Sequence, residues 1–283
     1  MVQEESWGKL LNPLTPVRTI CDNWFFLRQF TIRYIQSRFK GSFLGVLWLL
    51  AYPLMMLSIY TFVFCVVFRA KWGDVPGYTN SKLLFALMLF CGMAVFNVFS
   101  DSLGGGVSAI VSRPNFVKKI NTPLELLPVA MVLSALLLTL LWFAVLLVTI
   151  LFAYKGIPIT VLWLPVLLVP LVLLSLGSAW LVASLGVYIR DFGQAIPIFT
   201  QVAFFLTPIF YSVDMIPEEY QFILALNPLT GMVENMRLIL LQGQMPQMLG
   251  WGGWLAQTIG TLIFSQLCYV WFMKTKRGFA DVM

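Results

Sequence analysis

The ionisable residues of this chain are few, and their placement does not suit catalysis. The 283 residues include no histidine, the commonest general base and metal ligand, and the four cysteines show no paired spacing. The 12 acidic residues lie in the tails, at corners or at the ends of apolar runs, and none falls in the middle of a run, where a charge would mark an ion path. No GxxxxGKS/T loop for ATP is present. We therefore expect no catalytic, cofactor or metal site on this chain, and energy for active transport has to come from another subunit.

One pair of charges has the spacing of a helical ion pair. Glu234 and Arg237 lie three residues apart, so on a helix they share a face. They follow Asn227-Pro228, where Asn suits an N-cap and Pro suits the first helical position, and Gly243 offers a stop. The apolar pieces here are too short to cross a bilayer. The segment 217–241 therefore predicts a re-entrant helical hairpin that starts at Pro217 and is neutralised by its own ion pair.

The elements that have to position these residues belong in a membrane. The chain is 60% hydrophobic and 11% charged, and its apolar runs are continuous rather than alternating, which favours helices over a barrel. We predict an all-α polytopic membrane protein with a single transmembrane domain over 41–273, flanked by segments 1–40 and 274–283. The six expected transmembrane helices are 43–68, 83–111, 124–152, 161–189, 192–211 and 251–273.

Two details of packing follow from small residues. Gly104-Gly105-Gly106 should bend or break the second span, because each glycine costs about 1 kcal/mol relative to alanine. Gly177 and Gly186 should let the fourth span approach its neighbours closely.

The basic residues predict the orientation. Six spans place both termini on one side, and 13 of the 18 Lys and Arg residues then fall inside while 5 fall outside. This bias predicts cytoplasmic termini in a multi-pass protein of the cytoplasmic membrane.

Two segments at the expected inner face are rich in basic residues. Residues 24–40 have a helical period with a polar side that includes Arg33 and an apolar side that includes Trp24 and Ile32, which predicts an amphipathic interface helix. Residues 113–121 predict a short helix between spans two and three, followed by a capping box from Thr122 to Glu125. Each segment is either a plain anchor or positive-inside loop, or a surface that docks a cytoplasmic partner.

The remaining candidates are aromatic. Most aromatic residues in spans face lipid or the membrane interface, but some could line a path on which sugar faces slide along rings without a deep binding site. The candidate lining residues are Tyr60 and Phe64 in span one, and Phe199, Phe204, Phe205 and Tyr211 in span five.

Three stretches together carry a family resemblance. They are RYIQSRFKGSFLGVLWLLAYPL at 33–54, GVYIRDFGQAIPIFTQVAFFLTPIFY at 186–211, and the combination of IP at 216–217 with NPLTGMVENMR at 227–237. In this order they resemble the membrane subunit of ABC transporters that export polysaccharides such as O-antigen, capsule and teichoic acid. The likeness extends over most of the chain.

The resemblance implies partners and roles that the residues alone do not give. It implies a homodimer, two copies of a separate ATPase that holds ATP and Mg²⁺, and a polyprenyl-diphosphate-linked glycan as substrate, with membrane lipid around the dimer and no nucleic acid. The segment 217–241 would close the channel on the outer side through Pro217, Asn227, Pro228, Glu234 and Arg237. The ATPase would contact the segments 24–40 and 113–121, with coupling residues Arg33, Arg38, Arg113, Pro114, Phe116, Lys118 and Lys119.

Alternatives stay open at this point. The same spans could serve an exporter of capsule or teichoic acid polymers, or of small lipids or drugs. A polyprenyl-linked glycosyltransferase or polymerase would need ionisable residues in the outer loops, where only Asp214, Glu218, Glu219 and Glu234 are present.

Overall fold

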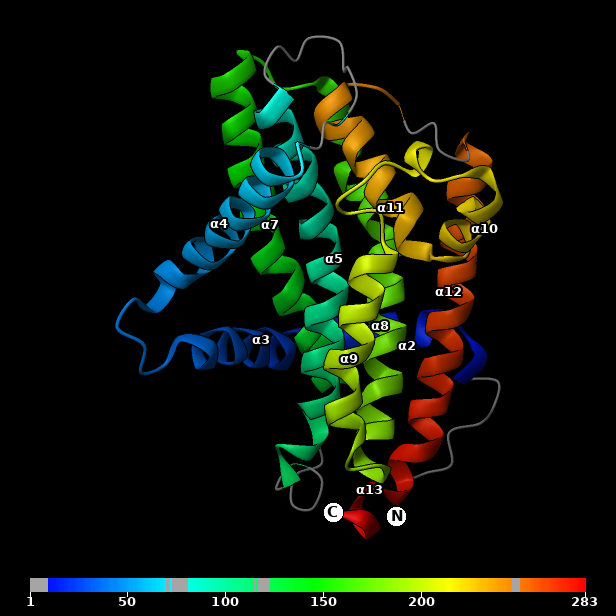
Figure 1. Cartoon of the computed structure of the whole chain (residues 1–283). Helices are drawn as coiled ribbons and strands as arrows, with labels where there is room; N and C mark the ends of the chain where they lie inside the picture. The colour runs from blue at the N-terminus through cyan, green and yellow to red at the C-terminus, as the bar shows by residue number, and fades with distance from the viewer. Residues whose placement is uncertain (1–9, 70–71, 73–80, 115, 117–122, 246–249) are drawn as a thin grey trace.

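The described part of the chain is helical throughout. The structure is a computed structural model that describes residues 10–69, 72, 81–114, 116, 123–245 and 250–283, and within these ranges it contains helices and turns but no strand (Figure 1). Five of its helices are long and apolar enough to cross a membrane. They are α4 (Trp48–Thr61, continued by the π-helix η2, Phe62–Val67), α5 (Ser81–Val111), α7 (Leu126–Tyr154), α8 (Leu164–Tyr188, preceded by η3, Ile159–Trp163) and α12 (Gly250–Thr275). The expectation of an all-α polytopic membrane protein is confirmed.

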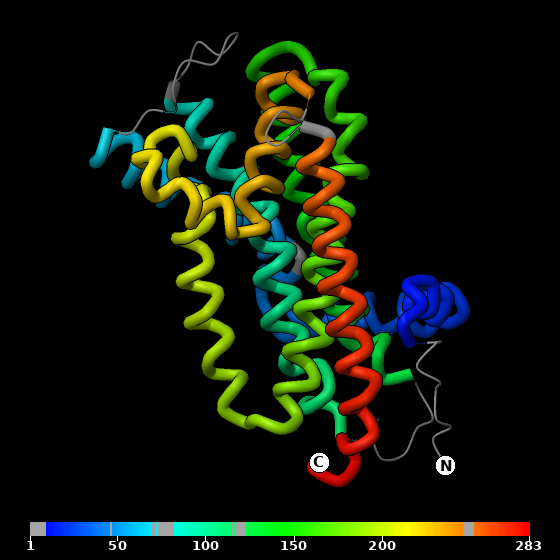
Figure 2. Tube along the Cα trace, turned by 90° about the vertical axis from the view of Figure 1, so that its right-hand side faces the viewer, coloured from blue at the N-terminus to red at the C-terminus, as the bar shows by residue number. Residues whose placement is uncertain are grey.

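The expected fifth span is shorter than the sequence suggested. It forms α9 (Phe192–Leu206), whose 15 residues rise about 22 Å at 1.5 Å each, less than a bilayer core of about 30 Å. The helix ends because Thr207 precedes Pro208 and is extended, with φ −89° and ψ 136°. The end predicted at residue 211 is therefore wrong. Figure 2 shows α9 rising from the end of α8 to the short helices that follow it.

The helix α5 forms the centre of the bundle. It packs between α7 and α8. Of the most apolar 18-residue stretch of α5, 78% is buried inside the protein, against 11% for the corresponding stretch of α4. The slanted α4 is the least buried of the long helices (Figure 1). Most of the α4 surface is therefore free to contact lipid or another chain.

The expected break in the second span does not occur. The helix α5 continues through Gly104–Gly106, where Gly106 allows α8 to approach and Gly105 packs against Met131 of α7. A Cβ atom on Gly106 would lie 2.9 Å from Val182 Cγ2 and 3.1 Å from Ala179 Cα. On the facing helix, a Cβ atom on Gly186 would lie 2.8 Å from the carbonyl oxygen of Val107, so the close approach predicted for Gly186 is confirmed. Packing between helices outweighs the low helix propensity of glycine here.

Two short helices lie across the long helices, in the half of the bundle that holds the C-terminus (Figure 1). They are α2 (Leu14–Asp22), which the sequence analysis did not anticipate, and α3 (Trp24–Phe39). The helix α3 runs transverse to the spans (Figure 1) and buries Leu27 and Thr31 against the bundle, where it contacts α7. Trp24 and Ile32, on the predicted apolar side, are 54% and 42% exposed and so remain accessible to a membrane interface. Thr31 can be buried because its hydroxyl donates to the Leu27 carbonyl oxygen at 2.9 Å.

Glu125, the last residue of the predicted capping box, forms a long-range ion pair. The helix α7 begins at Leu126, and the Glu125 carboxylate accepts from Lys276 Nζ at 2.8 Å, without making a side-chain cap. Thr122 lies outside the described residues. The ion pair joins the start of α7 to the end of the chain, which finishes with η6 (Lys276–Gly278) and α13 (Phe279–Val282).

The segment between α9 and α12 forms short helices, as predicted for a hairpin. A 3₁₀ turn, η4 (Val213–Met215), leads to α10 (Glu218–Leu226), α11 (Pro228–Arg237) and the π-helix η5 (Leu238–Gln242). Gly243 ends η5 in a left-handed conformation with φ +63°, as expected of a C-terminal glycine. We call residues 217–241 the hairpin below.

Candidate transport path and its two ends

An aromatic cluster joins α4 to α9. Its centre is Phe210, which is 7% exposed and lies beyond the end of α9. The Phe210 ring centroid lies 4.8 Å from Phe64, 5.2 Å from Tyr60, 5.1 Å from Phe204 and 6.0 Å from Phe205. These distances are typical of interacting aromatic pairs. Four of the six predicted lining residues therefore lie in one group, which we call the Phe210 cluster.

The other two predicted lining residues lie elsewhere. Phe199 is 54% exposed on α9, and Tyr211 donates its hydroxyl to the Phe205 carbonyl oxygen at 3.0 Å. Phe210 lies in the same aromatic run of the expected fifth span as Tyr211. The turn at Thr207-Pro208 brings Phe210 back onto α4, and this turn was the signal that the sequence offered.

A buried arginine fixes the hairpin to the bundle. Arg237 is fully buried, and its Nη1 donates to Glu234 Oε1 at 2.7 Å, which confirms the predicted pair. Its Nη2 donates to the Ile209 carbonyl oxygen at 2.8 Å, and its Nε donates to the Met88 carbonyl oxygen at 3.2 Å. The guanidinium also lies 4.2 Å from the centroid of the Trp72 ring. One side chain thus joins α11 to α5, to the turn after α9 and to Trp72.

Asn227 fixes the other end of α11. Its Oδ1 accepts from the Leu229 amide at 3.0 Å, which confirms the predicted N-cap before Pro228. Its Nδ2 donates to Thr207 Oγ1 at 3.0 Å and to the Leu206 carbonyl oxygen at 3.3 Å. The hairpin is therefore tied to the end of α9. Pro217 lies where expected, directly before α10.

The basic residues at the opposite end of the bundle are partly committed to internal contacts. Arg38 donates to both carboxylate oxygens of Asp101 on α5, at 2.9 and 3.2 Å. Burial alone would lower the pKa of Arg38, but the hydrogen bond and charge of Asp101 raise it, so Arg38 stays charged. Arg113 donates to the Ala109 carbonyl oxygen at 3.0 Å, and burial lowers its pKa. Arg33 is exposed and available to a partner.

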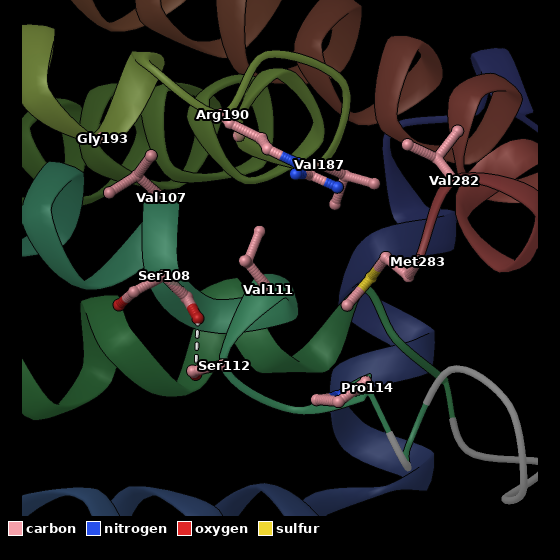
Figure 3. A pocket seen from close by; sticks show the side chains of 11 residues that line it. Val107, Ser108, Val111, Ser112, Pro114, Val187, Arg190, Gly193, Val282 and Met283 are labelled. Carbon is pink, nitrogen blue, oxygen red and sulfur yellow. Dashed lines mark hydrogen bonds between the residues drawn. The ribbon is translucent and has the colours of Figure 1, made fainter.

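The predicted short helix between the second and third spans lies mostly outside the described residues, and so do Lys118 and Lys119. Of its described residues, Phe116 packs edge-on against Phe30 of α3 at 5.2 Å. Pro114 lines a pocket of about 630 Å³ between the end of α5, the corner after α8 and the C-terminal residues (Figure 3). Arg190 contributes the cationic side chain of this pocket. The described residues of the second basic segment, Arg113, Pro114 and Phe116, thus lie on the same side of the bundle as α3.

Comparison of the sequence with known proteins agrees with this helical membrane fold. The chain belongs to the ABC-2 type transporter family, whose sequence profile matches residues 26–241. It is the membrane permease subunit of such a transporter, and this confirms the expectation of a transporter subunit rather than an enzyme.

Several known transport proteins are similar to the chain over most of its length. An O-antigen export system permease protein RfbA of Klebsiella pneumoniae is 28% identical over 245 residues, which cover 84% of this chain and 90% of the relative. The RfbA protein of Myxococcus xanthus is 29% identical over 221 residues, or 76% and 79% of the two chains. The polysialic acid transport protein KpsM of Escherichia coli is 25% identical over 75% of this chain and 80% of its own.

Proposed function

We propose that this chain is the channel-forming permease subunit of an ABC transporter that exports a polyprenyl-diphosphate-linked, O-antigen-like polysaccharide across the cytoplasmic membrane. ATP hydrolysis in a separate subunit supplies the energy. The observation that carries this proposal is the Phe210 cluster, which places aromatic rings where α4 and α9 meet. The names of the similar permeases support a polysaccharide as the cargo.

A second copy of the chain completes the path. Within the described residues, α4 and α9 bury little of their surface: Phe62, Phe199 and Phe205 are 60%, 54% and 58% exposed. Two such faces opposed across a dimer axis would enclose a conduit with aromatic walls. Aromatic rings suit the apolar faces of sugar residues, and a polymer can advance along them without a deep trap.

The hairpin serves as the outer gate in this proposal. It lies at the far end of the bundle from α3 (Figure 1), and Arg237 and Asn227 attach it to α5 and α9. A gate has to hold a defined closed position, and a buried arginine with three hydrogen bonds provides one. Pro217 and Pro228 set the start of each hairpin helix.

The basic end of the bundle faces the cytoplasm and docks two copies of the ATPase, which bind ATP and Mg²⁺. The docking surface comprises α3 with Arg33 and Arg38, and the segment 113–121 with Arg113, Pro114, Phe116, Lys118 and Lys119. Arg38 and Arg113 already have partners within the chain, so we expect them to shape this surface, whereas Arg33 is free to contact the ATPase directly.

The proposal is tested by co-expressing the chain with its partner ATPase and reconstituting the pair in vesicles. We expect a stable complex and ATP-dependent movement of lipid-linked glycan into the lumen. Transport by the chain alone without ATP would defeat the proposal.

The likeness to a polysialic acid transport protein makes a capsule polymer the second candidate cargo. Movement of a capsule or teichoic acid polymer, or of a small lipid or drug, in place of the O-antigen-like glycan would select one of the alternative exporters.

A further inference from the structure

A second cavity lies away from the Phe210 cluster, at the end of α4 that adjoins α3. It has a volume of about 410 Å³, within the range of small-molecule sites. Residues from α3, α4, α5 and α7 line it, and the lining combines an ion pair, hydroxyl and amide groups, and aromatic rings. We call it the α3–α4 cavity.

The charges in this cavity cancel. Arg38 and Asp101 form a two-pronged ion pair, so the guanidinium is already neutralised by a carboxylate in the same wall. A phosphate would meet the Asp101 carboxylate, and a cation would meet Arg38. The site therefore disfavours a charged ligand of either sign and accepts a neutral one.

The polar groups in the cavity wall call for a polar occupant. Within the described ranges, the side chains of Asn97, Ser100 and Tyr52 make no hydrogen bond to the protein. Pro53 has no N–H group, so the Leu49 carbonyl lacks its usual helical donor, and both residues line the cavity. Unpaired polar groups among membrane-spanning helices are costly, so a lipid tail is a poor fit.

The aromatic part of the cavity wall further restricts the chemical class of the ligand. Trp142 is 8% exposed and is held by stacking on Phe90 at 5.5 Å, while Trp48 is 39% exposed. Indole rings favour the apolar C–H face of a ring-shaped ligand, and amide, carboxylate and guanidinium groups bind its hydroxyl edge. A neutral ligand with one apolar face and a rim of hydroxyl groups is a sugar ring.

The cavity is also connected to the aromatic path. A smaller cavity of about 170 Å³ shares Tyr52, Asn97 and Ser100 with it and extends to Tyr60 and Phe204 of the Phe210 cluster. A ligand in the α3–α4 cavity therefore lies at one end of a continuous series of aromatic and polar side chains.

We propose that the α3–α4 cavity is a sugar-binding subsite that holds one sugar residue where the glycan enters the path. This inference rests on the proposed export of a glycan and adds a specific polar site to a path otherwise made of ring faces. The neutral lining distinguishes the subsite from one for the diphosphate or the lipid tail of the substrate.

The test is photo-labelling of the full chain in lipid nanodiscs with three probes that share one diazirine-bearing alkyl chain. One probe carries a glucoside, one a phosphate and one a carboxylic acid. We expect the glucoside to label peptides that contain residues 48–53, 97–101 and 138–142, in competition with the same glucoside lacking the diazirine.

Two variants and a control make the test specific. Asn97→Leu and Tyr52→Phe should each lower glucoside labelling about fivefold, as expected for one lost hydrogen bond. Ser108→Ala, on the same helix but outside the cavity, should leave it unchanged. Labelling that is equal for all three probes, or that neither variant lowers, would overturn the proposal of a sugar-binding subsite.

The subsite and the proposed function fail in different ways. If the reconstituted complex exports glycan but the cavity shows no preference for the glucoside, the subsite is wrong and the function stands. If the cavity binds the glucoside but the complex moves no glycan, the proposed function is wrong.

Discussion

Replacing Arg237 alone should lower the stability of the fold more than replacing Arg237 together with Glu234. In Arg237→Met the Glu234 carboxylate, whose side chain is 15% exposed, loses its partner at 2.7 Å. The Ile209 and Met88 carbonyl oxygens lose a donor as well. Removing one member of a buried pair costs about 3–5 kcal/mol because the other charge stays buried without compensation.

The double variant Glu234→Leu with Arg237→Met removes both charges and keeps the volume apolar. Replacement of a buried pair by apolar side chains is often neutral, so most of the stability should return. At roughly 2–4 °C per kcal/mol, the single variant should lower Tm by about 6–20 °C, and the double variant should lower it by much less. Arg190→Met, at an exposed arginine outside the spans, is the matched control and should leave Tm unchanged.

The assay is thermal unfolding of the purified chain in detergent, followed by ion leak through proteoliposomes at a temperature where every variant is folded. We expect Arg237→Met to leak because its hairpin has lost three attachments. The role assigned to the buried pair would be refuted if the single variant had the Tm and the ion leak of the parent. It would also be refuted if the double variant had a Tm as low as that of the single variant.

Three further predictions concern other contacts of the path and its ends. Asn227→Ala should cost about 0.5–2 kcal/mol by loss of the N-cap and speed hydrogen exchange at Leu229, and unchanged exchange there would argue against the cap. Phe210→Ala should lower Tm and export, because each aromatic pair contributes about 0.5–1.5 kcal/mol. Phe199→Ala, at an exposed ring, should not lower Tm. Equal effects of the two substitutions on Tm would contradict the stabilising role of the Phe210 cluster. Lys118→Glu combined with Lys119→Glu should leave ATP hydrolysis in the complex but abolish export, and normal export would remove the docking role of segment 113–121.

The hairpin could be predicted from the sequence because its signals are local. Asn227-Pro228 marks a helix start, and Glu234 and Arg237 lie one helical turn apart, so neighbouring residues determine both features. The end of α9 could also have been predicted, because the helical conformation is disfavoured for a residue that precedes proline. The apolar run continues past Thr207, and the prediction followed that run instead.

Contacts between distant segments could not be predicted in the same way. Arg38 meets Asp101 across 63 positions, and Lys276 meets Glu125 across 151, and no periodicity reports such a pair. The packed face of α3 was missed for a related reason. Lipid and protein interior are similarly apolar, so hydrophobicity does not show which side of a membrane helix faces the bundle. Leu27 and Thr31 face it because α7 lies there.

The central claim is that this permease moves a lipid-linked glycan through a path closed by the hairpin, with energy from a separate ATPase. It is tested most directly by trapping the hairpin in the reconstituted complex. A disulfide between cysteines placed at Gly231 of α11 and Gln257 of α12, where a Cβ atom on Gly231 would lie 3.4 Å from Gln257 Oε1, should stop ATP-dependent glycan export, and reduction should restore it. Undiminished export with the hairpin fully cross-linked would contradict the claim.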